Sequence, residues 1–227
     1  MKKQHIALFV TGGIAAYKVP LLVRALIKAG HDVRVAMTKS AERFVTPETL
    51  AIVSKAAVLT DGHEFDHPEH VAHVALAHWA DLGVVVPATA NTLAKLANGL
   101  ADNVVTTTLL AMQAPKLLVP AMNDQMWQNP QTQKNIASLM TEQNYLVLPP
   151  ETGLLAEGYA GIGRMPEPER IALFIESLDD PGYVVAVSSF LPAEPKNDLI
   201  LSATLQTTLQ VRWARRLPMP RPELVPK

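Results

Sequence analysis

The sequence predicts an α/β protein in which a doubly wound parallel sheet lies between two layers of helices. Short apolar runs alternate with segments of helical periodicity along most of the chain, and this alternation calls for right-handed crossovers and helices on both faces of the sheet. The first run, Ile6 to Val10, is apolar at every position, which is typical of a strand covered on both faces. Small, hydroxyl-bearing or amide-bearing residues follow the runs, at the edge where such sheets bind ligands.

The apolar runs predict five strands, at Ile6–Val10, Val33–Met37, Leu82–Pro87, Lys116–Pro120 and Leu146–Pro149. Helices are predicted at Pro47–Ser54, Asn91–Asn98, Asn103–Met112, Pro130–Glu142 and Pro168–Leu178. The first helical pattern runs from Ile14 to Leu26 and stops before Gly30. Pro20 interrupts it, so we expect a kink or a late helix start there, because proline lacks the backbone N–H.

The composition bounds the class of protein. The chain has 227 residues, of which 48% are hydrophobic and 18% charged, and these values predict a globular domain with room for an appendage. A formal charge of -1 gives no reason to expect a nucleic-acid partner. The sequence has no cysteine, and the run Ile6 to Val10 is too short for a signal sequence or a membrane span. We therefore expect a cytoplasmic protein without a membrane partner.

A change of composition near Leu178 predicts a domain boundary. Seven of the 18 prolines follow Asp179, and strand–helix alternation is not sustained there. We predict one domain over residues 1–178 and an atypical Pro-rich tail over residues 179–227, extended or docked as the arm of an oligomer.

Thr11-Gly12-Gly13 joins the first strand to the first helix, where bare backbone amides attract a phosphate. The spacing is neither G-x-G-x-x-G nor a P-loop, so neither NAD nor ATP is favoured over a mononucleotide. An ordinary tight turn explains the two glycines equally well.

Polar residues gather at the crossover after the third predicted strand. Thr89 or Asn91 can cap the following helix, which is the simplest interpretation. With Thr92 and Asp102-Asn103 nearby, the unit holds more polar groups than a cap requires. These side chains could equally grip a ribityl chain or the edge of a flavin.

His73 lies just before the third strand, and an imidazole can act as acid or base near neutral pH, although a structural role is more common in such a setting. The neighbouring histidines raise a metal-site alternative: His63, His67, His70 and His78. We expect no metal, because the sequence has no H-E-x-x-H and no thiolate ligands.

An ordered series of motifs gives a more specific indication. It comprises Thr11-Gly12-Gly13-Ile14-Ala15-Ala16-Tyr17-Lys18, His73-Val74-x-Leu76-x-x-Trp79-Ala80-Asp81, Pro87-x-Thr89-Ala90-Asn91-Thr92, Asp102-Asn103, Pro120-Ala121-Met122-Asn123, Met126-Trp127-x-Asn129-Pro130, Leu155-Ala156-x-Gly158 and Gly163-Arg164-Met165. Together these motifs resemble the homo-oligomeric flavin-containing cysteine decarboxylases over roughly residues 5 to 178. The resemblance implies a flavodoxin-like, Rossmann-like fold.

The resemblance also implies an activity: FMN-dependent decarboxylation of 4'-phosphopantothenoylcysteine to 4'-phosphopantetheine in coenzyme A biosynthesis. By matching positions, His73 is the active-site base and Asn123 holds the substrate carboxylate. The matched cofactor residues are Gly12, Gly13, Thr38, Thr89, Ala90, Asn91, Thr92 and Ala121. The matched substrate residues are Asn123, Met126, Ala156 and Arg164. The family further implies a homotrimer or homododecamer whose sites are completed by neighbouring subunits.

One position departs from the family pattern. Glu157 replaces the family's cysteine, which protonates the enethiol intermediate. Our hypothesis is that Glu157 is the acid instead, since a carboxyl whose pKa is raised by burial can donate a proton. The alternatives are a catalytically impaired flavin-binding regulatory or assembly protein, and a peptidyl-cysteine decarboxylase with a wider lid.

Two further expectations concern the last part of the chain. The glycines of the segment 158–166 predict a hinged lid in which Arg164 meets the substrate phosphate or carboxylate, with a surface turn as the alternative. Many bacterial relatives carry a ligase domain after the decarboxylase. No signature of it occurs after Asp179, so one interpretation of the tail is the remnant of a truncated ligase domain.

Overall fold

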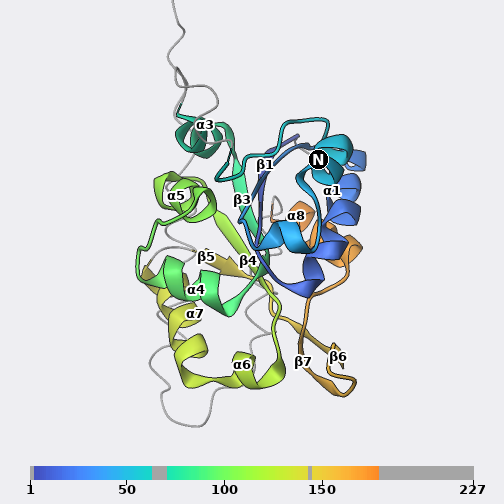
Figure 1. Ribbon diagram of the computed structural model, residues 1–227, viewed down its shortest axis with the longest axis vertical. Helices are drawn as coiled ribbons and strands as arrows, with labels where there is room; N and C mark the ends of the chain where they lie inside the picture. Colours follow the sequence, from blue (N-terminus) through green and yellow to red (C-terminus); the bar gives the residue numbers. More distant parts are fainter. Residues whose placement is uncertain (1–2, 63–70, 143–144, 179–227) are drawn as a thin grey trace, which may run out of the picture. The chain divides into compact units, whose positions relative to one another are not determined.

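The computed structural model describes residues 3–62, 71–142 and 145–178 (Figure 1). Five strands form a parallel sheet in the order β2-β1-β3-β4-β5, the flavodoxin-like order. They are β1 His5–Val10, β2 Asp32–Met37, β3 Leu82–Ala88, β4 Lys116–Pro120 and β5 Tyr145–Val147. The predicted fold class is confirmed, and each predicted strand is present within one or two residues of its expected bounds.

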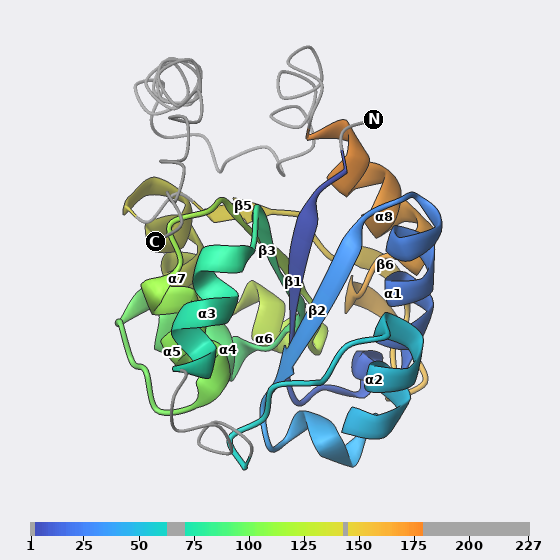
Figure 2. The same cartoon turned by 90° about the horizontal axis from the view of Figure 1, so that it is seen from above.

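Helices cover both faces of the sheet, as Figure 2 shows. One face packs against α1 Val19–Lys28, α2 Pro47–Ser54 and α8 Pro168–Ser177. The other packs against α3 Ala72–Trp79, α4 Ala90–Ala97, α5 Val104–Ala111, α6 Asp124–Gln128 and α7 Pro130–Glu142. All seven residues of β3 are buried, because this strand lies in the middle of the sheet between two apolar layers.

The first helix starts late, as Pro20 predicts. A 3-10 helix, η1 Ile14–Lys18, precedes α1, and Pro20 occupies the second position of α1, where no N–H is needed. The helix ends before Gly30, whose φ of 98° is a conformation that glycine adopts without strain.

Helices α3 and α6, the short 3-10 helix η2 Ala41–Arg43 and the strands β6 and β7 were not predicted. Helix α3 begins after Val71, which provides no side-chain cap, so its start carries no capping signal. Helix α6 has only five residues. Strands β6 Glu151–Leu154 and β7 Ala160–Arg164 form an antiparallel hairpin whose β6 side is largely solvent-facing, so it lacks the apolar run that marks the sheet strands.

The proposed Pro-rich tail, residues 179–227, lies outside the described residues. Within the described part of the chain, no helix is long and apolar enough to cross a bilayer.

Candidate functional site

A cavity of about 1280 Å³ lies at the carboxyl ends of the parallel strands. The loops after β1, β2, β3 and β4 contribute to its wall, and the β6–β7 hairpin provides another part. A parallel sheet brings these loops to one edge although they are far apart in sequence. The cavity is therefore the place where the predicted site residues can meet.

The structure brings nearly all of the predicted residues to this one cavity. The predicted cofactor residues Gly12, Gly13, Thr38, Thr89, Ala90, Asn91, Thr92 and Ala121 line it, and so do Asn123, Met126, Ala156, Glu157 and Arg164. His73 is different. It is half-buried on α3 and does not belong to the described lining of this cavity.

Thr11 joins the loops after β1 and β3. Its hydroxyl donates to the carbonyl oxygen of Pro87 at 2.6 Å, and the backbone N–H of Thr89 donates to the Thr11 hydroxyl at 3.3 Å. Thr89 also caps α4, because its hydroxyl accepts from the N–H of Thr92 at 3.3 Å. Thr89, not Asn91, is therefore the cap, and Asn91 lies exposed on the cavity wall.

Near Gly12 the cavity wall consists of backbone without a side chain. A Cβ atom at Gly12 would lie 2.4 Å from the hydroxyl oxygen of Ser40, so only glycine fits between the two loops. Around it the lining combines hydroxyl and amide side chains with the cations Lys39 and Arg43. Backbone amides, hydroxyls and cations in this combination fit a phosphate and a ribityl chain.

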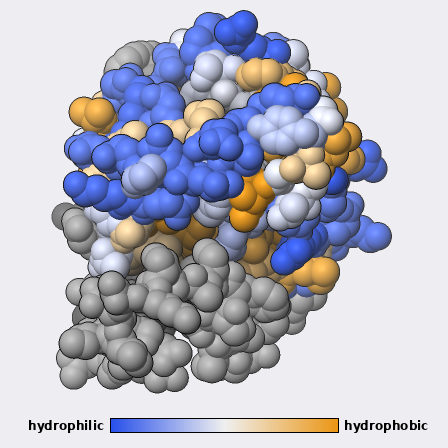
Figure 3. All heavy atoms as spheres, turned by 90° about the horizontal axis from the view of Figure 1, so that it is seen from below, coloured by the Kyte–Doolittle hydropathy of each residue, from blue (hydrophilic) through white to orange (hydrophobic). Residues whose placement is uncertain are grey.

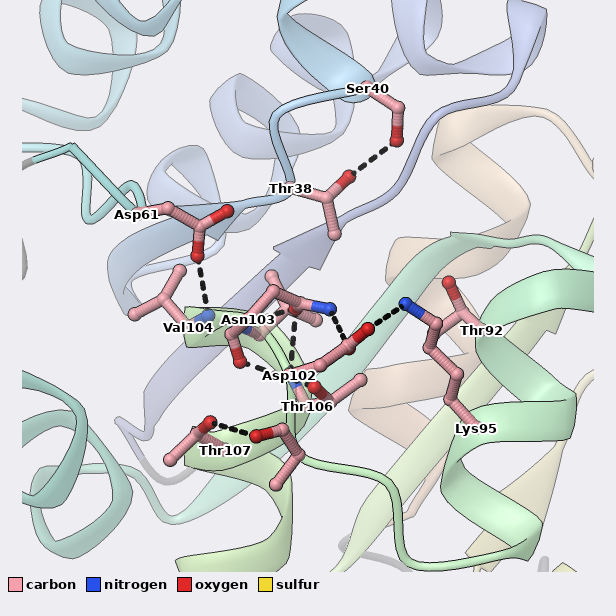
Figure 4. A network of polar contacts seen from close by, with 12 residues as sticks. Thr38, Ser40, Asp61, Thr92, Lys95, Asp102, Asn103, Val104, Thr106 and Thr107 are labelled. Atoms are coloured by element: carbon pink, nitrogen blue, oxygen red, sulfur yellow. Dashed lines mark hydrogen bonds and ion pairs between the residues drawn. The ribbon is translucent and has the colours of Figure 1, made fainter.

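A polar network at the same end of the cavity joins Asp102 and Asn103 to two residues that the sequence did not single out, Lys95 and Asp61 (Figure 4). Lys95 pairs with Asp102 at 2.6 Å, and this hydrogen bond lowers the pKa of Asp102. Asp61 accepts from the N–H of Val104 at 2.7 Å, and Asn103 caps α5. A signal in the sequence could have found Lys95 but not Asp61.

Lys95 is four residues after Asn91, so the two share one helix face. Asp61 carries no such signal, because the tertiary fold places it. Leu59, two residues earlier, forms an isolated parallel bridge with Ala36 of β2, which leads the chain toward the edge where the strands end.

The β6–β7 hairpin is anchored on the loop between β4 and α6. The N–H of Met122 donates to the carbonyl oxygen of Gly163 at 3.0 Å, and a Cβ atom at Gly163 would lie 2.0 Å from the carbonyl oxygen of Met122. A Cβ atom at Gly161 would approach Asp124 to 3.1 Å. The segment 158–166, predicted as a glycine-hinged lid, is thus largely the second strand of a docked hairpin.

The tip of this hairpin meets Asn123. The amide nitrogen of Asn123 donates to Glu157 Oε1 at 2.8 Å and to the Tyr159 hydroxyl at 2.9 Å, and Tyr159 donates to Asp124 Oδ1 at 2.6 Å. The Tyr159–Asp124 hydrogen bond raises the pKa of Tyr159 and lowers the pKa of Asp124. Asn123 and Glu157, matched separately in the sequence, are therefore in direct contact. Glu157 is exposed, so the burial that the proton-donor hypothesis assumed for its carboxyl group is not observed.

A buried lysine, missed as a site residue, also reaches the cavity. Lys18 is only 8% exposed and pairs with Glu167 at 2.9 Å, while Arg164 binds the same carboxylate oxygen. The hydrogen bond from Lys18, supported by that from Arg164, lowers the pKa of Glu167. Two cations on one carboxylate leave a net positive charge on this wall.

Apolar side chains also line the opening. Ile14, Tyr17, Met126 and Leu154 are exposed and belong to the lining. On the face seen from below, Figure 3 shows apolar areas in orange between hydrophilic side chains. No group of acidic and imidazole side chains with the makings of a metal site occurs among the described residues, and His63, His67 and His70 lie outside them.

Comparison with known proteins identifies the family. The model of the family named Flavoprotein matches residues 1–178. The chain is 45% identical over 176 residues to the coenzyme A biosynthesis bifunctional protein CoaBC of Bacillus subtilis, covering 78% of this chain and 43% of that protein. It is 44% identical over 175 residues to a probable phosphopantothenoylcysteine decarboxylase of Streptococcus mutans, covering 76% of this chain and 97% of that protein.

A solved structure of a PPC decarboxylase mutant in complex with pantothenoylaminoethenethiol aligns with a TM-score of 0.73 at 33% identity, covering 79% of this chain and all of that one. These matches confirm the resemblance to flavin-containing cysteine decarboxylases, while the chain spans less than half the length of its Bacillus subtilis relative. The chain belongs to the flavoprotein family.

Proposed function

We propose that this protein binds FMN and decarboxylates 4'-phosphopantothenoylcysteine to 4'-phosphopantetheine, a step of coenzyme A biosynthesis. The observation that carries the proposal is the single cavity that joins the matched cofactor residues to Asn123 and Glu157. The 97% coverage of the Streptococcus mutans decarboxylase supports it, because that relative has the length of the decarboxylase domain alone.

The cofactor residues would hold the flavin by its polar parts. The backbone at Gly12 and Gly13 would meet the phosphate, with Thr38 and Ser40 beside it, while Thr89, Ala90, Asn91, Thr92 and Ala121 would line the rest of the cofactor. When bound, the flavin supplies a reversible two-electron oxidation of the thiol-bearing carbon, which provides the electron sink that loss of a carboxylate needs.

The substrate would extend from there toward the hairpin. Asn123 would donate to the substrate carboxylate, and Met126 and Ala156 would contact the chain between carboxylate and phosphate. Arg164, on the positive side of the cavity, would meet the phosphate. Glu157 would donate the proton that completes the saturated product, in place of the cysteine of the family pattern.

We also propose that the site is completed by a second copy of the chain, in a homotrimer or homododecamer. His73 is the matched base, yet it lies on α3 and is not among the described lining residues of its own chain's cavity, so a neighbouring copy would supply it. The exposed apolar side chains at the opening, Ile14, Tyr17, Met126 and Leu154, support such a contact.

Two further parts of the proposal concern location and domain limits. We infer a cytoplasmic protein from its cysteine-free sequence. We also infer a decarboxylase domain that ends near Leu178, as the family match over residues 1–178 supports.

The deciding experiment is to purify the protein, record its absorption spectrum and add 4'-phosphopantothenoylcysteine. We expect a yellow protein that releases CO2 and forms 4'-phosphopantetheine. A preparation that stays colourless after reconstitution with FMN contradicts the proposal. For Glu157, mass spectrometry of the products compares the native protein with Glu157→Gln, which should accumulate the unsaturated enethiol; saturated product at an unchanged rate eliminates Glu157 as the proton donor.

A further inference from the structure

Both donor positions of the Asn123 amide are occupied by groups of the hairpin tip. Asn123 Oδ1 accepts from the N–H of Gln125 at 2.9 Å, which fixes the orientation of the amide, so its nitrogen points toward the hairpin. That nitrogen donates to Glu157 at 2.8 Å and to Tyr159 at 2.9 Å. Any further acceptor for this nitrogen must therefore displace either Glu157 or Tyr159.

The hairpin turn holds Glu157 and Tyr159 beside Asn123. The N–H of Gly158 donates to the carbonyl oxygen of Leu155 at 3.0 Å, and the N–H of Leu155 donates to the carbonyl oxygen of Tyr159 at 2.8 Å. Gly158 has a φ of 88°, which lets the chain reverse between the two side chains. The backbone thus places the Glu157 carboxylate next to the Asn123 amide.

Tyr159 cannot take over the donor role of Asn123. Its hydroxyl proton is committed to Asp124 Oδ1 at 2.6 Å, so the oxygen presents only lone pairs to Asn123. Asn123 can offer its amide N–H groups to an anion, but Glu157 contacts it directly and Asp124 lies beyond Tyr159. Arg164 is paired with Glu167, and the proposed function assigns it to the substrate phosphate, so it does not serve the carboxylate. An incoming carboxylate meets like charge unless Glu157 yields.

We propose that Glu157 occupies the carboxylate position of Asn123 in the free protein, so that a ligand carboxylate binds only by displacing it. This inference rests on the proposed function, because the substrate named there carries a carboxylate and the product does not. Glu157 is then a specificity-determining residue: it opposes binding of the carboxylate and reoccupies Asn123 once that carboxylate has left as CO2. The product has no carboxylate to bind Asn123, so it does not compete with Glu157 for this position when it is released.

The test uses two ligands that differ only in the carboxylate. The serine analogue of the substrate, 4'-phosphopantothenoylserine, keeps the carboxylate and lacks the thiol, and 4'-phosphopantothenoylethanolamine lacks both. Calorimetric titration of the FMN-loaded full chain measures the affinity for each. We expect Glu157→Gln and Glu157→Ala to bind the serine ligand about tenfold more tightly than the native protein, the size expected for removing one like charge at close range. Neither should change the affinity for the ethanolamine ligand.

Tyr159→Phe is the matched control, because it removes a hydrogen bond to Asn123 but leaves the charge of Glu157 in place. It should give a smaller gain for the serine ligand than either Glu157 variant, because it frees one N–H of Asn123 but keeps the like charge. Unchanged affinity for that ligand in both Glu157 variants, or an equal gain in Tyr159→Phe, overturns the inference while the proposed function stands. Failure of both ligands to bind the FMN-loaded native protein overturns the proposed function and this inference with it.

Discussion

Lys18 and Glu167 are 149 residues apart in sequence and form an ion pair of 2.9 Å that joins η1 to the start of α8. The Lys18 side chain is 10% exposed and the Glu167 side chain 46%, so the lysine depends on this partner more than the glutamate does. The pair also holds Arg164 on the cavity wall, since Arg164 shares the same carboxylate oxygen. One contact therefore links the packing of the last helix to the charge of the site.

Glu167→Gln should lower the free energy of unfolding by about 1–2 kcal/mol at neutral pH, because it leaves the buried Lys18 ammonium without an anionic partner. The pKa of Glu167 is lower in the folded state than in the unfolded state, so its contribution is present above the unfolded pKa and is lost as pH falls through the folded pKa. The difference between native and variant should shrink in that acidic window. Urea unfolding at neutral and acidic pH measures both effects.

The control for this prediction is Glu42→Gln, which removes a pair whose lysine, Lys39, is 83% exposed. An exposed pair contributes roughly 0–0.5 kcal/mol, so this variant should unfold almost like the native protein. Equal losses in the two variants would contradict a special role for burial at Lys18.

Thr89 caps α4 and also lines the cavity, so its replacement should affect both stability and the proposed binding of FMN. Thr89→Ala removes the cap of α4 and the contact of its hydroxyl with Thr11, so we expect a loss of about 1 kcal/mol in stability and weaker FMN binding. Thr89→Ser keeps the hydroxyl and should behave nearly as the native protein does. Denaturant unfolding without FMN measures the stability, and fluorescence titration with FMN measures the affinity. If Thr89→Ser restores neither the stability nor the affinity, the hydroxyl is not the cause of the losses.

The sheet and the position of its ligand edge could be predicted from the sequence, for local reasons. A strand buried on both faces must be apolar throughout, as Ile6 to Val10 and Leu82 to Val86 are, and parallel connections then place the loops after the strands at one edge. Thr38, Thr89 and Asn123 reach one cavity for this reason.

The rest depends on contacts between distant segments. Nothing near Lys18 in sequence indicates Glu167 as its partner, and the β6–β7 hairpin has little apolar pattern because it packs by backbone approach, as at Gly163 and Met122. The position of His73 outside the described cavity lining likewise depends on where α3 packs, which residue spacing does not encode.

Arg164→Ala should raise KM strongly for 4'-phosphopantothenoylcysteine and little for the unphosphorylated substrate, because a guanidinium binds a phosphate dianion through paired hydrogen bonds. We expect a change in the ratio of the two KM values of about tenfold or more. The measurement is the initial rate of CO2 release against the concentration of each substrate. Equal effects on both substrates would instead assign Arg164 to the shared part of the molecule or to the folding of β7.

Gly163→Ala should detach the hairpin from the loop between β4 and α6. The added Cβ atom would lie 2.0 Å from the carbonyl oxygen of Met122, a backbone atom that cannot move aside without breaking the Met122–Gly163 hydrogen bond. The turn that carries Glu157 and Tyr159 would then lose its position over Asn123, while the wall at Gly12 and Ser40, on other loops, would remain. We therefore expect FMN binding to survive and substrate affinity to fall by about tenfold or more.

Gly62→Ala is a suitable control for Gly163→Ala, because its Cβ atom would meet Thr60 at an ordinary 3.8 Å. Limited proteolysis should cleave the segment 151–164 faster in Gly163→Ala than in the native protein or the control. Native-like proteolysis together with native substrate affinity would mean that the hairpin tolerates the extra atom, and that its docking does not position Glu157 and Tyr159. Loss of FMN binding in Gly163→Ala would show that the hairpin supports the whole cavity, including the wall at Gly12.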